Sequence, residues 1–475
     1  MFILQLYSGQ NTSTGDFIYR IVRPAEGLSS IDGITVQNLD LLNAGNKQLL
    51  LNVPLLILHH LSDPDLLPVI KERRNQGFRT IYELADNFRF SQSHKTQNGS
   101  ASDYPVIMEE IIRRCDAVQT TSFALRNRYQ DLNDEFFIFP NLVDKVEYRE
   151  PRGSDKLTIG WGGSARHLDD LKQITQLLIE WVSQHPGVRL AIMGSKSIRQ
   201  IFEELSPEKL LLRDPGSLKD YLSFLDEIDI GIAPLLSTEF NACRSDVKFL
   251  EYASHEIVPV CSRFGPYIEI AEEGESLLLF NSPAELIQHL ERLRTDVELR
   301  SKIARNALQW VGKHRLSNQK LWESRAEIYR KFLPKYVNDF EWNDNIGQSN
   351  LADLIMPAIK AKNPAALLMN AVDLHPDDYQ AYYFYGWGLS KQGQYKHAVT
   401  PLRKALSLRP DSIRTAELLV RVLLINGDLD SALRTVEHGL SIEPNLKNLL
   451  ELKLTIQHIT DAIAQGDDIG VTALS

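Results

Sequence analysis

Cysteine and long apolar runs are scarce in this chain of 475 residues. The three cysteines, Cys115, Cys243 and Cys261, lie far apart and form no C-x-x-C pair. This spacing argues against a disulfide framework or a structural zinc site, and it fits a reducing compartment. No run reaches the roughly 18 apolar residues that a membrane-spanning helix needs. We therefore expect no transmembrane segment, and the short apolar start predicts a first strand, not a signal peptide.

The chain also lacks a surplus of positive charge. Its formal net charge is -10, and it contains no dense run of Lys and Arg. An acidic chain of this kind is a poor candidate for nucleic-acid binding. The apolar content of 43% is enough for packed cores, and the length suggests about three domains. We expect a cytoplasmic protein, and its composition leaves peripheral contact with a membrane open.

A repeat of 34 residues marks the C-terminal part of the chain. Small residues recur at this step, and so do prolines: Ala371, Ala405 and Gly439; Pro376, Pro410 and Pro444. Small residues let two antiparallel helices approach closely, and a proline ends the second helix. The pattern resembles tetratricopeptide repeats, with units at 345–378, 379–412 and 413–446 and a capping helix near 447–465. The first unit is degenerate, because Pro364 stands at its usual alanine position.

Residues 1–334 instead alternate short β-rich runs with amphipathic helical segments, which indicates parallel sheets covered on both faces. A polar break at 147–155 separates two halves, and a polar linker at 338–350 leads into the repeats. We predict two Rossmann-like α/β domains, 1–150 and 151–334, followed by an all-α repeat module, 345–465. The expected strands are Val53–Leu58, Arg79–Tyr82, Ala117–Thr120, Phe136–Phe139, Leu157–Trp161, Val188–Met193, Ile228–Ala233 and Ile257–Cys261.

The first stretch that suggests chemistry is LTIGWGGSARHLDD, residues 157–170. A predicted strand ends in glycines, and a helix follows. Glycine lets the backbone approach a ligand, and a helix N-terminus favours negative charge, so a phosphate or diphosphate near Gly163 and Ser164 is the functional interpretation. The alternative is a strand–helix turn whose glycines serve steric purposes alone.

The second stretch is FNACRSDVKFLEYA, residues 240–253. Ser245 or Asp246 can cap a helix, on which Lys248 and Glu251 are three residues apart and share a face. Lys248 can then meet a phosphate near the helix start, and Glu251 can accept hydrogen bonds from ribose hydroxyls. The alternative is an exposed Lys–Glu pair of little consequence.

The stretches IGWGGSARHLDDL, IDIGIAPL and FNACRSDVKFLEYASHEIVPV stand in an order and spacing that resemble the second domain of GT4-type glycosyltransferases of the GT-B superfamily. The first half is similar through TIYELADN and RRCDAVQTTSFALRNRY. The resemblance implies transfer of a sugar from a donor such as a UDP- or GDP-sugar (EC class 2.4, hexosyltransferase type), with retention of configuration. It also implies a donor bound mainly by the second domain and no metal or other cofactor.

Carried over by residue, the resemblance makes Glu251 the ribose ligand, Lys248 a diphosphate ligand, and Gly163 and Ser164 the loop beneath the diphosphate. The basic residue often found in the first turn of this domain is replaced by Arg166 or His167. The family's first glutamate of E-x7-E would fall at Cys243, which cannot play that part. In the first domain, His59, His60 and Asp86 follow strand signals and are the candidate catalytic residues, with an ordinary loop histidine as the alternative.

We expect a glycosyltransferase that uses a nucleotide sugar, with a glycan, a glycolipid or a protein as acceptor and a protein partner bound by the repeats. The missing glutamate favours an alternative, a catalytically silent GT-B scaffold whose repeats recruit partners. A nucleotide-sugar epimerase shares the architecture, but the residue 240–253 pattern argues against it. No Asp-x-Asp pair stands at a strand end in a donor-binding context, because Asp63-Pro-Asp65 lies in a proline-containing loop.

Overall fold

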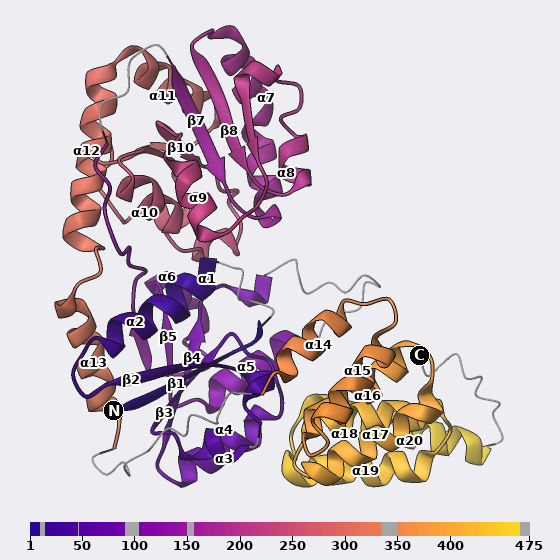
Figure 1. Ribbon diagram of the computed structural model, residues 1–475. Coiled ribbons are helices and arrows are strands. Elements are labelled where there is room, and N and C mark those ends of the chain that lie inside the picture. The colour runs from indigo at the N-terminus through magenta and orange to yellow at the C-terminus, as the bar shows by residue number, and fades with distance from the viewer. Residues whose placement is uncertain (10–14, 46, 91–103, 150–155, 335–348, 466–475) are drawn as a thin grey trace.

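The computed structural model describes residues 1–9, 15–45, 47–90, 104–149, 156–334 and 349–465 (Figure 1). The sequence-predicted boundaries at 150–151 and at 345 fall outside these residues, as do most of the two predicted linkers. Within the described residues the chain forms two six-stranded parallel sheets and then a run of paired helices. This arrangement confirms the predicted fold class.

The first sheet has the order β2-β1-β3-β4-β5-β6, with every pair parallel. Strand β3 is buried along its whole length and apolar up to its last residue, His59, as expected for a central parallel strand covered on both faces. The strands are β1 (Phe2–Tyr7), β2 (Thr35–Asp40), β3 (Leu55–His59), β4 (Arg79–Leu84), β5 (Ala117–Thr120) and β6 (Phe136–Ile138). The helices are α1 (Gly15–Phe17), α2 (Arg23–Ser29), α3 (Lys47–Asn52), α4 (Leu66–Asn75), α5 (Tyr104–Arg114) and α6 (Phe123–Tyr129), and a π-helical turn, Ile18–Val22, joins α1 to α2.

The second sheet has the order β12-β11-β10-β7-β8-β9, again all parallel. Its strands are β7 (Leu157–Gly162), β8 (Val188–Met193), β9 (Leu210–Arg213), β10 (Ile230–Ala233), β11 (Val258–Ser262) and β12 (Leu278–Phe280). Its helices are α7 (Leu168–Gln184), α8 (Lys196–Gln200), α9 (Leu218–Leu225), α10 (Val247–Ser254), α11 (Pro283–Thr295) and α12 (Val297–His314). Ligands of such sheets bind beyond the carboxyl ends of the strands, which is where the candidate residues of both halves lie.

Two segments cross between the sheets, and they meet side by side. Val143 forms a parallel bridge with Leu316, supported by hydrogen bonds from Val143 N to Arg315 O (2.9 Å) and from Ser317 N to Val143 O (2.8 Å). After the second crossing, α13 (Gln319–Phe332) packs against the first domain, with Trp322, Ala326 and Tyr329 in one core with Ile3 and Leu28. The sequence range 151–334 therefore includes a helix that belongs by packing to the first domain.

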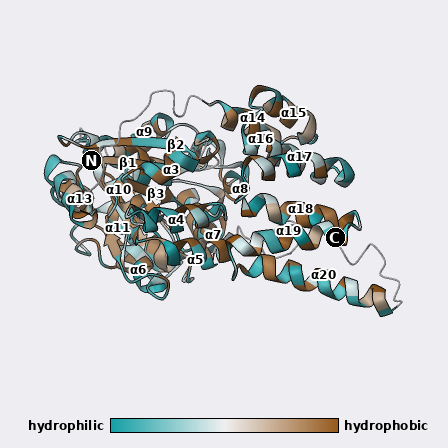
Figure 2. Cartoon of the chain, turned by 90° about the horizontal axis from the view of Figure 1, so that it is seen from below, coloured by the Kyte–Doolittle hydropathy of each residue, from teal (hydrophilic) through white to brown (hydrophobic). Residues whose placement is uncertain are grey.

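The C-terminal module consists of paired helices with the predicted period. The pairs are α14 (Leu351–Ile359) with α15 (Pro364–Leu374), α16 (Tyr379–Lys391) with α17 (Tyr395–Leu408), and α18 (Ile413–Ile425) with α19 (Leu429–Ile442), followed by α20 (Lys447–Gln465). Gly393 and Gly427 join the helices of two pairs with φ of 72° and 77°, where a side chain would be strained. Pro364 is tolerated because it lies at the start of α15. Figure 2 shows the helices stacked beside the two-domain body, with α20 at the end of the stack.

The helical module is docked on the first domain through buried polar contacts. The carboxylate of Asp65, 2% exposed, accepts hydrogen bonds from Ser412 Oγ (2.8 Å), Tyr379 Oη (3.1 Å) and the backbone N–H of Arg414 (2.9 Å). Arg414 in turn pairs with Asp63 at 2.9 Å. The Asp63-Pro-Asp65 loop is therefore an interdomain anchor and not a metal-binding pair.

Candidate active site

Lys248 and Glu251 project from the same face of α10 and contact one another, as the sequence spacing predicts. Lys248 Nζ lies 2.8 Å from Glu251 Oε2, and the two side chains are only 17% and 10% exposed. Tyr221, on α9, donates from its phenol to Glu251 Oε2 (2.7 Å) and accepts from Lys248 Nζ (2.8 Å). Lys248, Glu251 and Tyr221 thus form a largely buried hydrogen-bonded network. This burial contradicts the alternative of an exposed Lys–Glu pair.

The same carboxylate reaches the first domain. Tyr19, in the π-helical turn before α2, donates its phenol hydrogen to Glu251 Oε1 at 3.4 Å. Burial raises the pKa of the phenols of Tyr19 and Tyr221, and the charge of Glu251 raises them further. Both hydroxyls therefore remain protonated donors to the carboxylate at neutral pH. Glu251 lies where the two domains meet.

A further cation, Arg244, precedes α10 in the chain. The guanidinium of Arg244 stacks on the ring of Phe240, 4.7 Å from its centroid. Arg244 Nε and Nη2 are buried and have no hydrogen-bond partner among the described residues. A buried charged donor without a hydrogen-bond partner is unfavourable, and Arg244 lies four residues before Lys248 in the chain, so the start of α10 offers a place for an anion.

The glycine-containing turn has the predicted form. Strand β7 ends at Gly162, Gly163 N donates to Met193 O (3.0 Å), and Ser164 begins a 3-10 turn, Ala165–His167, that leads into α7. An added Cβ at Gly163 would lie 2.8 Å from the Trp161 ring, so steric fit alone accounts for a small residue there. The structure thus supports the steric interpretation of this glycine and leaves its contact with a phosphate as a prediction.

His167 is held in a polar network behind this turn. His167 Nδ1 lies 2.9 Å from Asp170 Oδ2, while Asp170 Oδ1 accepts from Asn241 Nδ2 (2.7 Å). Burial lowers the pKa of His167 to about 4, an effect that the nearby charges of Arg244 and Lys248 increase and that Asp170 opposes. The neutral ring is a hydrogen-bonding group at pH 7. It therefore does not supply the positive charge that the sequence comparison assigned to Arg166 or His167.

Two carboxylates of the first domain face the cations of the second. Desolvation raises the pKa of Asp86, just after β4, while Arg244 and Arg166 lower it. Asp16 also has a raised pKa, because of desolvation and the neighbouring charge of Asp86. The charges of His60, Arg244 and Arg166 oppose that rise. The charges of Asp86, His60, Arg244 and Arg166 all act on Asp16, so these side chains lie in one region, and their parts in binding and catalysis stay predictions.

His59 and His60 have different surroundings. His59 is 4% exposed, and its Nε2 lies 3.0 Å from Gln5 Oε1, inside the first domain. Desolvation and the charge of Arg20 hold the pKa of His59 well below its ordinary value, so the ring stays neutral. His60 has a φ of 53°, a conformation that turns the chain sharply after β3. Of the two histidines, only His60 is close to the carboxylates and cations described above.

The expected helix cap takes a different form. Asp246 is the N-cap residue of α10, but its carboxylate makes no capping hydrogen bond. It pairs instead with Arg315 (2.8 Å), which also donates to Asn141 O (3.2 Å). The start of α10 is consequently tied to both crossing segments, and its N–H groups are not capped by this side chain.

A glycosyl transferase-like family and two sequence relatives match part of the chain. Residues 166–330 match the family described as glycosyl transferase-like. The chain is 27% identical over 176 residues to glycosyltransferase 1 domain-containing protein 1 of Xenopus tropicalis, an alignment that covers 35% of this chain and 47% of that protein. It is 22% identical over 138 residues to alpha-monoglucosyldiacylglycerol synthase of Acholeplasma laidlawii, covering 28% of this chain and 34% of that one. The alignments thus span about half of the first relative and a third of the second.

Solved structures extend the similarity to both domains. The structure of HepE from Anabaena in complex with UDP and glucose superposes with a TM-score of 0.52 at 14% identity, covering 70% of this chain and 100% of that one. Sucrose-phosphate synthase from Thermosynechococcus elongatus gives a TM-score of 0.52 at 13% identity, covering 70% and 99%. The chain has the GT-B fold. Within this GT-B protein, the family match at 166–330 includes α10 and confirms the resemblance to group 1 glycosyltransferases for the second domain. The tetratricopeptide assignment of the paired helices stays a prediction.

Four residues of the candidate site were not singled out from the sequence. Arg244 lies within the quoted 240–253 stretch, and only its charge marks it. Tyr221 and Tyr19 have no local signal, since Tyr19 is 232 residues from its partner Glu251. Asp16 likewise has no local signal. Tyr19 and Asp16 are recognised only once the two domains are placed together, and Tyr221 only once the second domain is folded.

A hollow lies between the first domain and the helical module, away from the candidate site. It encloses about 850 Å³. Lys47 and Gln48 line one side, and the turns around Pro376 and Pro410 line the other. Lys47 bridges the two sides by pairing with Asp411 at 2.7 Å.

No helix among the described residues is both long and apolar enough to cross a membrane.

Proposed function

We propose that this protein is a nucleotide-sugar-dependent glycosyltransferase whose donor binds at α10 of the second domain. The observation that carries the proposal is the buried guanidinium of Arg244, which has two unpartnered N–H-bearing atoms among the described residues and lies four residues before Lys248 in the chain. A diphosphate supplies the acceptor oxygens that these donors lack. The match of residues 166–330 to a glycosyl transferase-like family supports this assignment.

In this proposal Lys248 and Arg244 bind the diphosphate, the Gly163–Ser164 turn lies beneath it, and Arg166 adds positive charge. Glu251 accepts hydrogen bonds from the ribose hydroxyls in place of one of its present partners. Stabilisation of the leaving diphosphate by fixed cations and the start of α10 needs no metal ion. We therefore expect transfer, with retention of configuration, to persist in a chelator. Turnover lost in EDTA and restored by Mg²⁺ or Mn²⁺ would contradict this.

The first domain contributes the face toward the sugar and the acceptor. We propose that His60 and Asp86 contact the transferring sugar and that Asp16 assists them, because these groups face the cations of the second domain. His59 has a positioning part, since it is buried against Gln5. This differs from the sequence expectation, which gave both histidines the same role.

For the acceptor and for the partner of the repeats, we propose a chemical class only. We propose tetratricopeptide-type repeats that bind a protein or peptide, and a glycan, glycolipid or protein acceptor. The lipid-directed name of the Acholeplasma relative supports a lipid acceptor. The docking of the helices on the first domain supports a role for the repeats in presenting an acceptor to that domain.

A silent GT-B scaffold is the second candidate, and two observations favour it. Cys243 stands where the family's first glutamate would fall, and it is 1% exposed with a pKa raised chiefly by burial. Lys248 and Glu251 are already satisfied by one another and by Tyr221. A scaffold would bind a donor weakly or not at all and would not turn it over.

The deciding experiment is a two-step assay of the full chain. A panel of UDP- and GDP-sugars is first screened for a rise in Tm, since a ligand bound only by the native state stabilises it. The stabilising donor is then tested for nucleoside diphosphate release, alone and with candidate glycan, lipid and peptide acceptors. Binding with slow hydrolysis or transfer supports the enzyme. Binding without any turnover in every case supports the scaffold, and the absence of binding by all donors contradicts the proposed site.

A further inference from the structure

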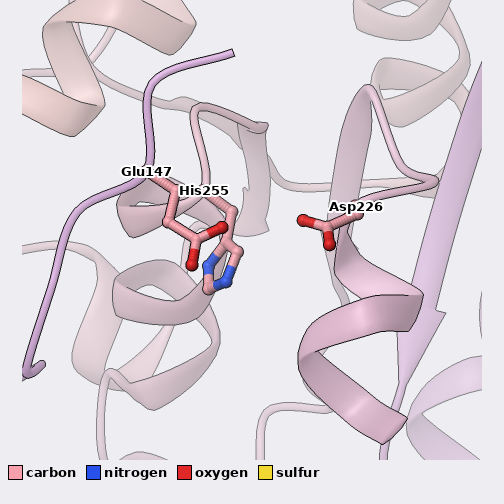
Figure 3. Close-up of side chains that lie close together, drawn as sticks. All are labelled: Glu147, Asp226 and His255. Carbon is pink, nitrogen blue, oxygen red and sulfur yellow. The ribbon is translucent and has the colours of Figure 1, made fainter. Parts of the chain in front are cut away.

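Three side chains from separate segments meet on the second domain, apart from the face that carries Lys248. Glu147 lies in the first crossing segment, Asp226 follows the end of α9, and His255 follows the end of α10. An imidazole nitrogen and one oxygen from each carboxylate all lie within 4.8 Å of one another. Figure 3 shows Glu147 and His255 close together, with the carboxylate of Asp226 pointing toward them.

His255 is prepared as an electron-pair donor. Its Nδ1 lies 2.9 Å from the backbone oxygen of Glu251, so this nitrogen carries the hydrogen and donates it. The ring is 4% exposed, and Nε2 is buried without a hydrogen-bond partner among the described residues. A metal-bound histidine has this same arrangement, because its second nitrogen donates to a carbonyl that fixes the tautomer. The unpartnered Nε2 is therefore an unused ligand atom.

We propose that Glu147, Asp226 and His255 form a binding site for a divalent transition-metal ion of the Zn²⁺ type. One imidazole and two carboxylates are a donor set that suits Zn²⁺, and water would complete the coordination. The imidazole disfavours Mg²⁺ and Ca²⁺, which prefer oxygen ligands alone. The ligand atoms are close but make no hydrogen bonds to one another. A metal ion can therefore lie between them after small side-chain rotations.

The carboxylates are accessible, and their present partners are replaceable. The side chains of Glu147 and Asp226 are 31% and 58% exposed. Lys145, itself 64% exposed, pairs with Glu147, and Arg149 approaches Asp226 at 3.7 Å. The Lys145–Glu147 pair is exposed and contributes little to stability, so a bound cation can displace it. Arg149, only 16% exposed, is held by the carbonyl oxygens of Leu225 and Ile228 and makes only the long 3.7 Å contact to Asp226.

An ion here would fix the first crossing segment to the second domain. Glu147 N already donates to Ser254 O (2.7 Å), and Arg149 N donates to the carboxylate of Glu256 (2.7 Å). The carbonyl that orients His255 belongs to Glu251, so the ion would also hold the end of α10. The role is structural and does not depend on the proposed glycosyl transfer.

The test uses the full chain, freed of metal by a chelator and dialysed. Zn²⁺ alone is titrated by calorimetry and by thermal unfolding, with Mg²⁺ as the comparison ion. We expect one Zn²⁺ per chain and a rise in Tm, with no effect of Mg²⁺. Co²⁺ should give the visible absorption of a histidine-bound ion. A chain that binds no Zn²⁺ overturns the proposal, as does an equal response to Mg²⁺.

Variants locate the bound ion. Asp226→Asn and Glu147→Gln should each weaken Zn²⁺ binding by more than about tenfold while leaving the metal-free Tm nearly unchanged, because both side chains are partly exposed. Asp214→Asn is the matched control, since this aspartate is 77% exposed in the same domain and pairs with Arg199. Unchanged Zn²⁺ affinity in the double variant Glu147→Gln/Asp226→Asn overturns the proposal. His255→Gln, tested for loss of the Co²⁺ absorption, checks the imidazole separately.

Discussion

Tyr19 of the first domain donates a hydrogen bond to Glu251 of the second, with 3.4 Å between Tyr19 Oη and Glu251 Oε1. The carboxylate that we propose as the ribose ligand is therefore also a direct link between the domains. Among the residues that the structure describes, it accepts hydrogen bonds from Tyr19, Tyr221 and Lys248. A bidentate ribose contact requires at least one of these donors to leave. If Tyr19 is the donor that leaves, nucleotide-sugar binding at Glu251 is coupled to the contact between domains.

Lys248→Ala should weaken binding of the donor by about tenfold to a hundredfold, because a charge-assisted contact contributes roughly 1.5–3 kcal/mol. Glu251→Gln should instead reduce the preference for ribose over deoxyribose, since its partners are hydroxyls. Calorimetric titration with the stabilising donor and its 2′-deoxy analogue measures both effects.

Lys172→Ala is the matched control for Lys248→Ala. Lys172 and Asp169 form an i,i+3 pair at 3.0 Å on α7, with 54% and 63% of the side chains exposed. An exposed pair of this kind contributes below about 1 kcal/mol, so donor affinity should not change. Equal donor affinity in Lys248→Ala and Lys172→Ala would remove Lys248 from the site and favour the scaffold.

Tyr19→Phe should leave donor affinity unchanged or raise it by up to about threefold. The Tyr19 contact is the longest of the three to Glu251, and long hydrogen bonds are weak, so we expect it to be the one that yields to ribose. The aromatic ring and its packing remain in the variant. Titration of wild type and variant with the same donor tests this, and affinity reduced by more than threefold would mean that Tyr19 positions Glu251 for the donor.

The central strands could be predicted because both of their faces are buried. The strands β3, β4, β5, β7, β8, β10 and β11 are almost wholly buried, and the predicted runs differ from them by only a residue or two at their ends. The strands absent from the sequence prediction, β2, β9 and β12, are all edge strands of their sheets. Strand β2, TVQNLD, is half exposed, and β9 and β12 are short. Partial burial and short length leave too weak an apolar pattern to recognise.

The site could be predicted only where its geometry is local. The i,i+3 spacing of Lys248 and Glu251 places them on one helix face whatever the tertiary structure is. The contacts with Tyr19 and with the first-domain carboxylates depend on how the domains meet, which no local pattern encodes. The docking of the repeats is similar, since Asp65 meets Ser412 across 347 residues of chain.

Asp65→Ala should loosen the helical module from the first domain. The change removes the acceptor of Ser412, Tyr379 and the Arg414 backbone, and breaking such a buried network lowers the free energy of unfolding by about 3–5 kcal/mol. We expect an earlier calorimetric transition for the module and faster proteolysis between residues 334 and 349. Asp461→Ala, on the exposed side of α20, is the control and should change neither. Equal behaviour of the two variants would mean that the docking contributes little.

His167 should make the protein less stable in mild acid. Its pKa is lowered from 6.5 to about 4 in the folded state, chiefly by burial, with Arg244 and Lys248 acting in the same direction and Asp170 against it. Between these values the unfolded chain binds a proton that the native state does not bind. The free energy of unfolding therefore falls as pH is lowered from about 6.5 to about 4, by about 3 kcal/mol for this group, and the loss levels off below pH 4.

His167→Asn isolates this contribution, because an asparagine amide can still donate to Asp170 but does not titrate. Urea unfolding at intervals across this pH range should show a shallower loss of stability in the variant than in the wild type. The variant retains the contributions of His59 and the carboxylates, so the difference between the two curves reports His167 alone. His458→Asn, an exposed histidine on α20, should reproduce the wild-type slope. If His167→Asn keeps the full wild-type slope, His167 is protonated in the folded protein and its network with Asp170 is an ion pair.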